Sequence, residues 1–307
     1  VEKGKEYRIE AFFRQIDNWT ASLNLSFGRE EPVQYDDLIN KLRGIDVVIF
    51  AGGISSQLEG EEMPVNLPGF KGGDRTDIEL PEVQRNCLKA LKQAGKKVIF
   101  INCSGSAIGL VPETESCDAI LQAWYGGESG GQAIADVLFG DFNPSGKLPV
   151  TFYRSIDQLP DFENYSMKGR TYRYMSDPLF PFGYGLSYTT FAVGDARLNK
   201  SVICPGESAV ISVPVSDTGK RAGTEVVQIY IRKTDDVDGP LKTLRGFRRV
   251  DLAPGQTKNV SINLPPSGFE FFDADSGKMK ISSGEYEVYY GTSSDNRDLK
   301  SVRLIIQ

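Results

Sequence analysis

The alternation of apolar and polar positions divides the chain into stretches of different character. Residues 7–13 and 19–27 alternate with a period of two, as half-buried antiparallel strands do, and Asp17-Asn18 between them is a turn signal. These segments predict a β-hairpin, which we interpret as the end of a β-rich module over residues 1–33. A simple N-terminal hairpin is the alternative interpretation.

From residue 34 the hydrophobic pattern changes, and segments with helical spacing alternate with short apolar segments. Apolar side chains at helical spacing, followed by glycine, predict three helices, at 35–43, 81–94 and 133–139. Ser129 and Gln132 have capping-box spacing before the third helix. Segments 46–50 and 97–102 are short, β-branched and apolar on both faces, which is typical of buried strands. The pattern favours an α/β domain over residues 34–177, with a mainly parallel sheet and helices on both faces.

Beyond residue 178 the composition and the periodicity of the chain change. Residues 178–190 are rich in aromatic residues, Pro and Gly and predict a packed linker, in which Tyr184 and Tyr188 hold the neighbouring domains together. The remainder, 191–307, predicts an all-β sandwich of immunoglobulin or fibronectin type III kind. Its predicted strands, separated by Pro-Gly and Gly turns, are 209–216, 225–233, 258–264, 286–291 and 299–306.

Composition narrows the function classes. The 307 residues carry a net charge of -6 and contain no histidine. An acidic chain argues against nucleic-acid binding, because phosphate neutralisation needs clustered Lys and Arg. No apolar run of membrane-spanning length is present. Without histidine, a Ser-His-Asp triad and imidazole metal ligands are excluded. The four cysteines lack C-x-x-C spacing and are interpreted as small buried hydrophobes.

The start of the chain lacks both an initiator Met and a signal-peptide pattern. We therefore expect it to be part of a longer precursor. A periplasmic or extracellular location is favoured.

The candidate chemistry lies in the loop 52–63, directly after the strand 46–50. It carries three carboxylates, Glu59, Glu61 and Glu62. The carboxyl ends of parallel strands are where open α/β sheets place their ligands. Two carboxylates flanking a glycosidic bond are the groups that glycoside hydrolysis needs, and a chain without histidine suits that chemistry. A solvated acidic loop is the alternative. Neither a dinucleotide-binding nor a Walker-type phosphate loop is complete here.

Several motifs, taken together and in order, resemble the second domain of glycoside hydrolase family 3. They are the loop 52–63, Gly73-Asp74-Arg75, Leu80 to Gln84, Gln122 to Gly131, 135–151 and 181–188. Leu244 to Phe247 and Leu252 to Gly255 resemble the fibronectin-like domain that follows in many members. The resemblance therefore spans most of the chain.

The resemblance implies a function and a set of residues. Members of this kind hydrolyse terminal β-linked glucose, xylose or related sugars with retention, using an Asp nucleophile from a preceding (β/α)8 barrel and an acid/base Glu from the α/β domain. A family segment like Glu-Ala-Glu-Gly-Met-Asp-Arg, laid over residues 59–65, assigns the acid/base role to Glu61, with Glu59 second and Glu62 third. Asp74 and Arg75 are candidate sugar contacts. No cofactor or metal is implied.

We therefore expect the C-terminal portion of a β-glycosidase, inactive without the barrel nucleophile. Its expected partners are a β-linked oligosaccharide and that barrel. Neighbouring carboxylates would raise the pKa of Glu61 and keep it protonated for its role as acid. Xylose and glucose both remain open as substrates. A non-catalytic carbohydrate-binding or scaffolding module is the competing hypothesis.

Overall fold

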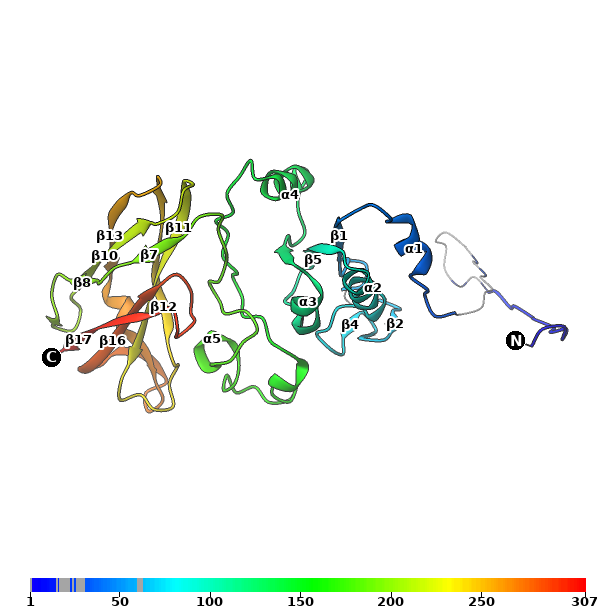
Figure 1. The fold of residues 1–307 in the computed structure, drawn as a ribbon. Helices are drawn as coiled ribbons and strands as arrows, with labels where there is room; N and C mark the ends of the chain where they lie inside the picture. Colours follow the sequence, from blue (N-terminus) through cyan, green and yellow to red (C-terminus); the bar gives the residue numbers. More distant parts are fainter. Residues whose placement is uncertain (1, 15, 17–22, 24, 26–30, 60–62) are drawn as a thin grey trace. The chain divides into compact units, whose positions relative to one another are not determined.

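The structure is a computed structural model of residues 1–307 and describes all of them except 1, 15, 17–22, 24, 26–30 and 60–62 (Figure 1). The chain divides into two compact units, Val1–Gly44 and Ile45–Gln307. None of the helices in the described part combines the length and the apolar character needed to cross a lipid bilayer.

The described part of the first unit contains one helix, α1 (Asp36–Lys41), as predicted. Acidic side chains in its first turn and a lysine in its last turn complement the helix dipole. The strand predicted at 7–13 is wrong, because these residues have no regular structure and Phe12 is 93% exposed. Alternation produces a stable strand only where one face is buried, and an isolated hairpin is marginal in water. Most of the second predicted strand, 19–27, lies outside the described residues.

The second unit begins with a three-stranded parallel sheet in the order β1-β5-β6. Its strands are β1 (Val47–Gly53), β5 (Lys97–Cys103) and β6 (Ala119–Gln122). Helices α2 (Glu82–Gln93) and α3 (Val111–Ser116) make the crossovers between successive strands. The predicted α/β class with a parallel sheet is confirmed.

The core of this domain lies between the sheet and α2. Val98 and Phe100 of β5 are fully buried, as are Leu88 and Leu91 on α2. Strand β1 differs from the prediction of burial on both faces, since Val47 and Ile49 are each 47% exposed. β1 is one of the two edge strands of the described sheet, where fewer neighbouring side chains are present to cover it.

A buried ion pair ties the two crossover helices together. Arg85 of α2 donates from Nε to Glu113 Oε1 at 2.7 Å and from Nη2 to Glu113 Oε2 at 3.1 Å. Glu113, on α3, is 1% exposed. Glu79 adds a second carboxylate 2.7 Å from the Arg85 Nη2. This bidentate arrangement fixes α2 against α3.

Smaller elements follow the main strands. Helix α4 (Gly130–Phe139) ends at Gly140 in a left-handed conformation, as predicted, but Ser129 makes no side-chain cap hydrogen bond. Gln132 instead donates to Asp136 one turn later. The short elements not predicted are β2 (Asn66–Leu67), β3 (Phe70–Lys71), β4 (Asp74–Arg75), the 3-10 helix η1 (Ile156–Gln158) and α5 (Thr171–Tyr174).

The C-terminal part is the predicted all-β sandwich, drawn from yellow-green to red in Figure 1. One sheet has the order β13-β10-β7, with β8 also paired to β10, and the other has the order β12-β11-β16-β17-β9. Alternate side chains of β10 and β11 meet in the core, where Ile211, Val213 and Ile229 are fully buried. The strands are β7 (Phe191–Val193), β8 (Arg197–Leu198), β9 (Val202–Ile203), β10 (Ala209–Asp217), β11 (Gly223–Lys233), β12 (Thr243–Leu252), β13 (Thr257–Leu264), β16 (Gly284–Gly291) and β17 (Lys300–Ile306). A further hairpin of β14 (Glu270–Asp273) and β15 (Lys278–Ile281) follows the 3-10 helix η2 (Pro266–Phe269).

Polar contacts join the sandwich to the preceding domain. Lys147 pairs with the buried carboxylate of Glu225 at 2.7 Å, and Arg249 Nη2 donates to Ser145 Oγ at 2.7 Å. The Tyr188 hydroxyl donates to the Val137 carbonyl of α4 at 2.7 Å, while the Arg221 guanidinium lies over its ring. Tyr188 therefore links the two domains as predicted. The ring of Tyr184 stacks on Phe180 within the linker itself.

The close approach of β1 and β5 generates a prediction. A Cβ added at Gly53, whose φ is +122°, would lie 1.9 Å from the Cys103 carbonyl oxygen. We expect Gly53→Ala to lower the free energy of unfolding by about 2–5 kcal/mol, from the combined overpacking and backbone strain. Gly95→Ala is the control, because Gly95 has φ +74° and open space around it; it should lose only about 1–2 kcal/mol. Urea unfolding measures both, and equal losses would contradict the prediction.

Candidate active site

The loop that carries the acidic residues leaves β1 through a fixed turn. The Gly53 N–H donates to Gln84 Oε1, and Gln84 Nε2 donates to the Gly53 carbonyl, both at 2.8 Å. The next residue, Ile54, is buried and donates its N–H to the Cys103 carbonyl. One amide side chain on α2 therefore satisfies both backbone groups of the strand's last residue and directs the loop across the carboxyl end of β5.

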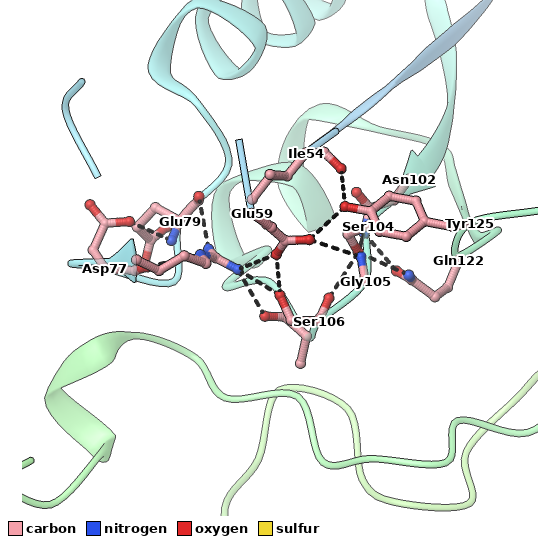
Figure 2. A network of polar contacts seen from close by, with 12 residues as sticks. Ile54, Glu59, Asp77, Glu79, Asn102, Ser104, Gly105, Ser106, Gln122 and Tyr125 are labelled. Carbon is pink, nitrogen blue, oxygen red and sulfur yellow. Dashed lines mark hydrogen bonds and ion pairs between the residues drawn. The ribbon is translucent and has the colours of Figure 1, made fainter. Parts of the chain in front are cut away.

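Glu59 is anchored by several surrounding side chains and backbone groups (Figure 2). Its Oε1 accepts a hydrogen bond from Ser106 Oγ at 2.5 Å. Its Oε2 accepts from the Gly105 N–H at 3.1 Å and from the Tyr125 hydroxyl at 2.6 Å. The side chain is only 14% exposed. Three donors from the ends of β5 and β6 therefore converge on one carboxylate.

Arg75 supplies the opposite charge. Its Nη1 lies 3.6 Å from Glu59 Oε1 and donates to Ser106 Oγ at 3.0 Å. The same guanidinium donates to the backbone carbonyls of Asp77 and Glu79. Of the two predicted sugar contacts, Arg75 thus lies inside the Glu59 network, whereas Asp74 beside it is exposed.

The network determines the charge state of Glu59. Burial raises the pKa of its carboxyl group, but hydrogen bonds from Ser106, Tyr125 and Gly105, together with the charge of Arg75, outweigh burial and lower the pKa below its ordinary value of 4.5. Burial and the hydrogen bond to this carboxylate raise the pKa of Tyr125 to about 12. Glu59 is therefore ionised and Tyr125 protonated at neutral pH.

A second polar network adjoins the first. Asn102 Nδ2 donates to Gln122 Oε1 at 2.6 Å, and Gln122 Nε2 donates to Ser104 Oγ at 3.1 Å. Ser104 in turn donates to the Ser106 carbonyl at 2.8 Å, which connects this network to the residue that binds Glu59. Ser104, Ser106 and Gln122 were not among the site residues predicted from the sequence. The available signal was the change from apolar to polar residues at the ends of two buried strands.

The remaining site predictions have different outcomes. Glu61 and Glu62 lie outside the described residues, so the role of Glu61 stays a prediction. Trp124, next to Tyr125 in the sequence, is partly buried, and its ring lies edge-on to that of Phe152. The interpretation of the four cysteines as buried holds for Cys87 but is wrong for the others, since Cys103 and Cys117 are partly buried and Cys204 is exposed. In the part of the chain that the structure describes, no three side chains of the Cys, Asp and Glu types are placed to hold a metal ion.

A shallow hollow lies beside the Glu59 network. It is lined by the end of β1 and the start of the acidic loop, together with Cys103 and Tyr125; the loop residues are Gly52, Gly53, Ile54, Ser55 and Ser56. Most of the surface of this hollow is apolar, and it lies at the edge of the sheet where α/β proteins bind ligands. Tyr125 lines the hollow and donates to Glu59, so this surface adjoins a fixed negative charge.

Comparison with known proteins gives a consistent family assignment. Residues 8–188 match the glycosyl hydrolase family 3 C-terminal domain, and residues 225–294 match a fibronectin type III-like domain. A xylan 1,4-beta-xylosidase of Xylanibacter ruminicola is 56% identical over 306 residues, which is 100% of this chain and 35% of that protein. A periplasmic beta-glucosidase of Salmonella typhimurium is 36% identical over 87% of this chain and 35% of its own length.

Solved structures agree with the sequence comparisons. A β-glucosidase from Erythrobacter marinus superposes with a TM-score of 0.76 at 37% identity, over 88% of this chain and 36% of that one. A β-glucosidase from Listeria innocua in complex with glucose gives a TM-score of 0.76 at 28% identity, over 90% and 39% of the two chains. The chain thus spans little more than a third of the length of these relatives.

The lowered pKa of Glu59 predicts how stability depends on pH. Because the folded-state pKa lies below 4.5, the contribution of Glu59 is fully present above that value and is lost as the pH falls through the lowered pKa. We expect Glu59→Gln to reduce the free energy of unfolding by about 1–3 kcal/mol near neutral pH. The deficit should shrink as the solution is acidified below 4.5. Urea unfolding across this pH range measures it.

Glu115→Gln is the matched control, because Glu115 is an exposed carboxylate of the same domain. It should change stability little at any pH. A Glu59→Gln deficit that stays constant on acidification would show that the carboxylate charge is not what stabilises the loop.

Proposed function

Since this chain belongs to glycosyl hydrolase family 3, we propose that it is the part of a retaining β-glycosidase that supplies the general acid/base carboxylate. The substrate class we propose is a terminal β-linked xylose or glucose. Relatives over most of this chain are named xylosidases and glucosidases, which supports both sugars. The nucleophile and the rest of the sugar pocket would come from a barrel domain of the same protein.

The observation that carries this proposal is the anchoring of the acidic loop. Glu59 is fixed by three hydrogen bonds and an ion pair at the carboxyl end of the sheet. Glu61 follows it by two residues in the sequence. A catalytic carboxylate must be held close to its productive position, and an anchored neighbour provides that support.

We assign the proton transfer to Glu61 rather than Glu59. A general acid must be protonated when the leaving group departs, which requires a pKa raised towards the working pH. The pKa of Glu59 is lowered instead, and the donors around it bind both of its oxygens. Glu59 therefore suits a fixed anion. In the proposed reaction, Glu61 protonates the glycosidic oxygen and then, as its carboxylate, removes a proton from the water that releases the sugar.

Asp74 and Arg75 have different proposed roles at the same site. Arg75 is committed to Glu59 and to backbone carbonyls, so it positions the loop. Asp74 has an exposed side chain on β4 and suits a direct hydrogen bond to a sugar hydroxyl.

Replacing the proposed acid tests the assignment. In a polypeptide that includes the preceding barrel, Glu61→Gln should slow hydrolysis of xylobiose or cellobiose by about 10²–10⁴-fold, the usual contribution of general acid catalysis. Aryl glycosides with good leaving groups should be slowed much less in the first step, because their departure needs no proton. Steady-state kinetics with both substrate types, with and without azide, measure the difference; azide replaces water without needing a base and should restore turnover.

Glu59→Gln is the matched comparison, two residues away in the same loop. If Glu59 only anchors the loop, its loss should reduce turnover of all substrates by a similar factor, and azide should not restore it. The opposite pattern, with leaving-group dependence and azide rescue in Glu59→Gln alone, would transfer the acid/base role to Glu59 and refute the assignment to Glu61.

The proposed nucleophile and the proposed acid/base lie on different domains, so this chain alone should be inactive. Residues 1–307 alone should show no β-xylosidase or β-glucosidase activity on nitrophenyl glycosides, because the nucleophile is on the barrel. Activity should arise when the barrel is present in the same polypeptide and should depend on Glu61. Hydrolysis by the 1–307 chain would contradict the proposal, and so would tight oligosaccharide binding by it together with inactivity of the longer protein, which would favour a binding module.

A further inference from the structure

A pair of arginines lies where the irregular segment before the sandwich meets β12. The Leu241 N–H donates to the Arg173 carbonyl at 2.7 Å, and the Leu244 N–H donates to the Tyr172 hydroxyl at 3.1 Å. These two hydrogen bonds fix α5, which carries Arg173, against the start of β12, which carries Arg245.

The backbone at or near both arginines has an unusual conformation. Thr171, two residues before Arg173, has φ +55°, a left-handed conformation that is strained for a β-branched residue. In β12, the register with β11 shifts so that Ile229 pairs with Gly246 and Tyr230 with Leu244. Arg245 is therefore the extra residue of a β-bulge. Bulges redirect side chains, and strain of this kind persists where the surroundings enforce it and often marks a functional position.

Several donors at this place have no acceptor. The Nε atoms of Arg173 and Arg245 and the Oγ1 atom of Thr243 are all inaccessible to solvent and have no hydrogen-bond partner in the described part of the chain. Arg245 makes one hydrogen bond, from Nη2 to the Glu270 carbonyl, and its guanidinium lies 5.1 Å from the centre of the Phe271 ring. Buried donors are normally paired, so three orphans together indicate an unfilled requirement for an acceptor.

The positive charge at this place also favours an anionic acceptor. Burial lowers the pKa of Arg245, and the positive charge of Arg173 lowers it further. Tyr172 and Glu270 act in the opposite direction. Neither Arg173 nor Arg245 forms an ion pair with a carboxylate among the residues described, in contrast to Arg85, which contacts two. Among the described residues, Glu270 is thus the carboxylate that acts on Arg245, without forming a direct ion pair with it.

We propose that Arg173, Thr243 and Arg245 form a binding site for a small oxyanion, either the carboxylate of an acidic sugar or inorganic phosphate. The guanidinium group presents donors in a planar fork that matches carboxylate and phosphate oxygens, and the hydroxyl adds a third donor. An anion at this place would satisfy the orphan donors and relieve the repulsion between the two arginines. The site is independent of the Glu59 network and of the proposed hydrolase function.

Calorimetric titration of the 1–307 chain tests the site. Sodium phosphate and sodium D-glucuronate are titrated separately into protein at constant ionic strength in chloride buffer, with D-glucose as the uncharged control. We expect at least one anion to bind and glucose not to bind. Arg173→Gln and Arg245→Gln should each weaken binding about tenfold or more, which corresponds to the loss of one charge-assisted contact. The control is Arg248→Gln, in which an exposed arginine of the same strand is lost, and it should bind like the wild type.

Thermal unfolding distinguishes the site from a purely structural cluster. Without an oxyanion, Arg173→Gln should unfold at a temperature no lower than the wild type, because it removes one of two repelling charges. With phosphate or glucuronate, the wild type should gain thermal stability and the variant should not. If neither anion binds beyond the level of the chloride control, or if Arg173→Gln and Arg245→Gln bind as tightly as the wild type, the proposal is wrong.

Discussion

The contact between Gly53 and the Cys103 carbonyl is the constraint on which the candidate site depends. Only a residue without a Cβ permits this approach of β1 to β5. The same contact lets Gln84 bind both backbone groups of Gly53, so that the chain leaves the strand in one direction. The position of Glu59 at the ends of β5 and β6 depends on that direction. The close packing of the β1 and β5 backbones is thus a precondition for the charged interactions of the site.

The electrostatic surroundings then determine the charge state of Glu59. A carboxylate that accepts hydrogen bonds on both oxygens is held ionised, and it becomes part of the scaffold. Glu59 is in that situation. A proton-transferring group needs the opposite surroundings, with few donors and nearby negative charge. Under the proposed assignment, Glu59 supports the loop and Glu61, two residues later in the sequence, transfers the proton.

Periodicity predicted the large elements but not the contacts that make the site. The strands β1 and β5 and helix α2 were foreseen because each has a continuous apolar face. The Glu59 network was not, since Ser106 and Tyr125 lie 47 and 66 residues away in sequence and no local pattern connects them. Strand β12 was missed because its run of arginines and its bulge break the alternation. Residues 7–13 alternated without a surface to pack against.

The junction between the α/β domain and the sandwich has a consequence for how the two evolve. Glu225 is buried and depends on Lys147 of the other domain, while Gln228 donates to the carbonyl of Gly183 in the linker. Separating the domains would leave the buried carboxylate of Glu225 without its ion-pair partner and would remove one of the two hydrogen bonds that Gln228 Nε2 donates, and each loss is costly. The sandwich therefore cannot be removed without a loss of these stabilising contacts. A gene rearrangement that exchanged it for another module would have to replace these junction residues at the same time.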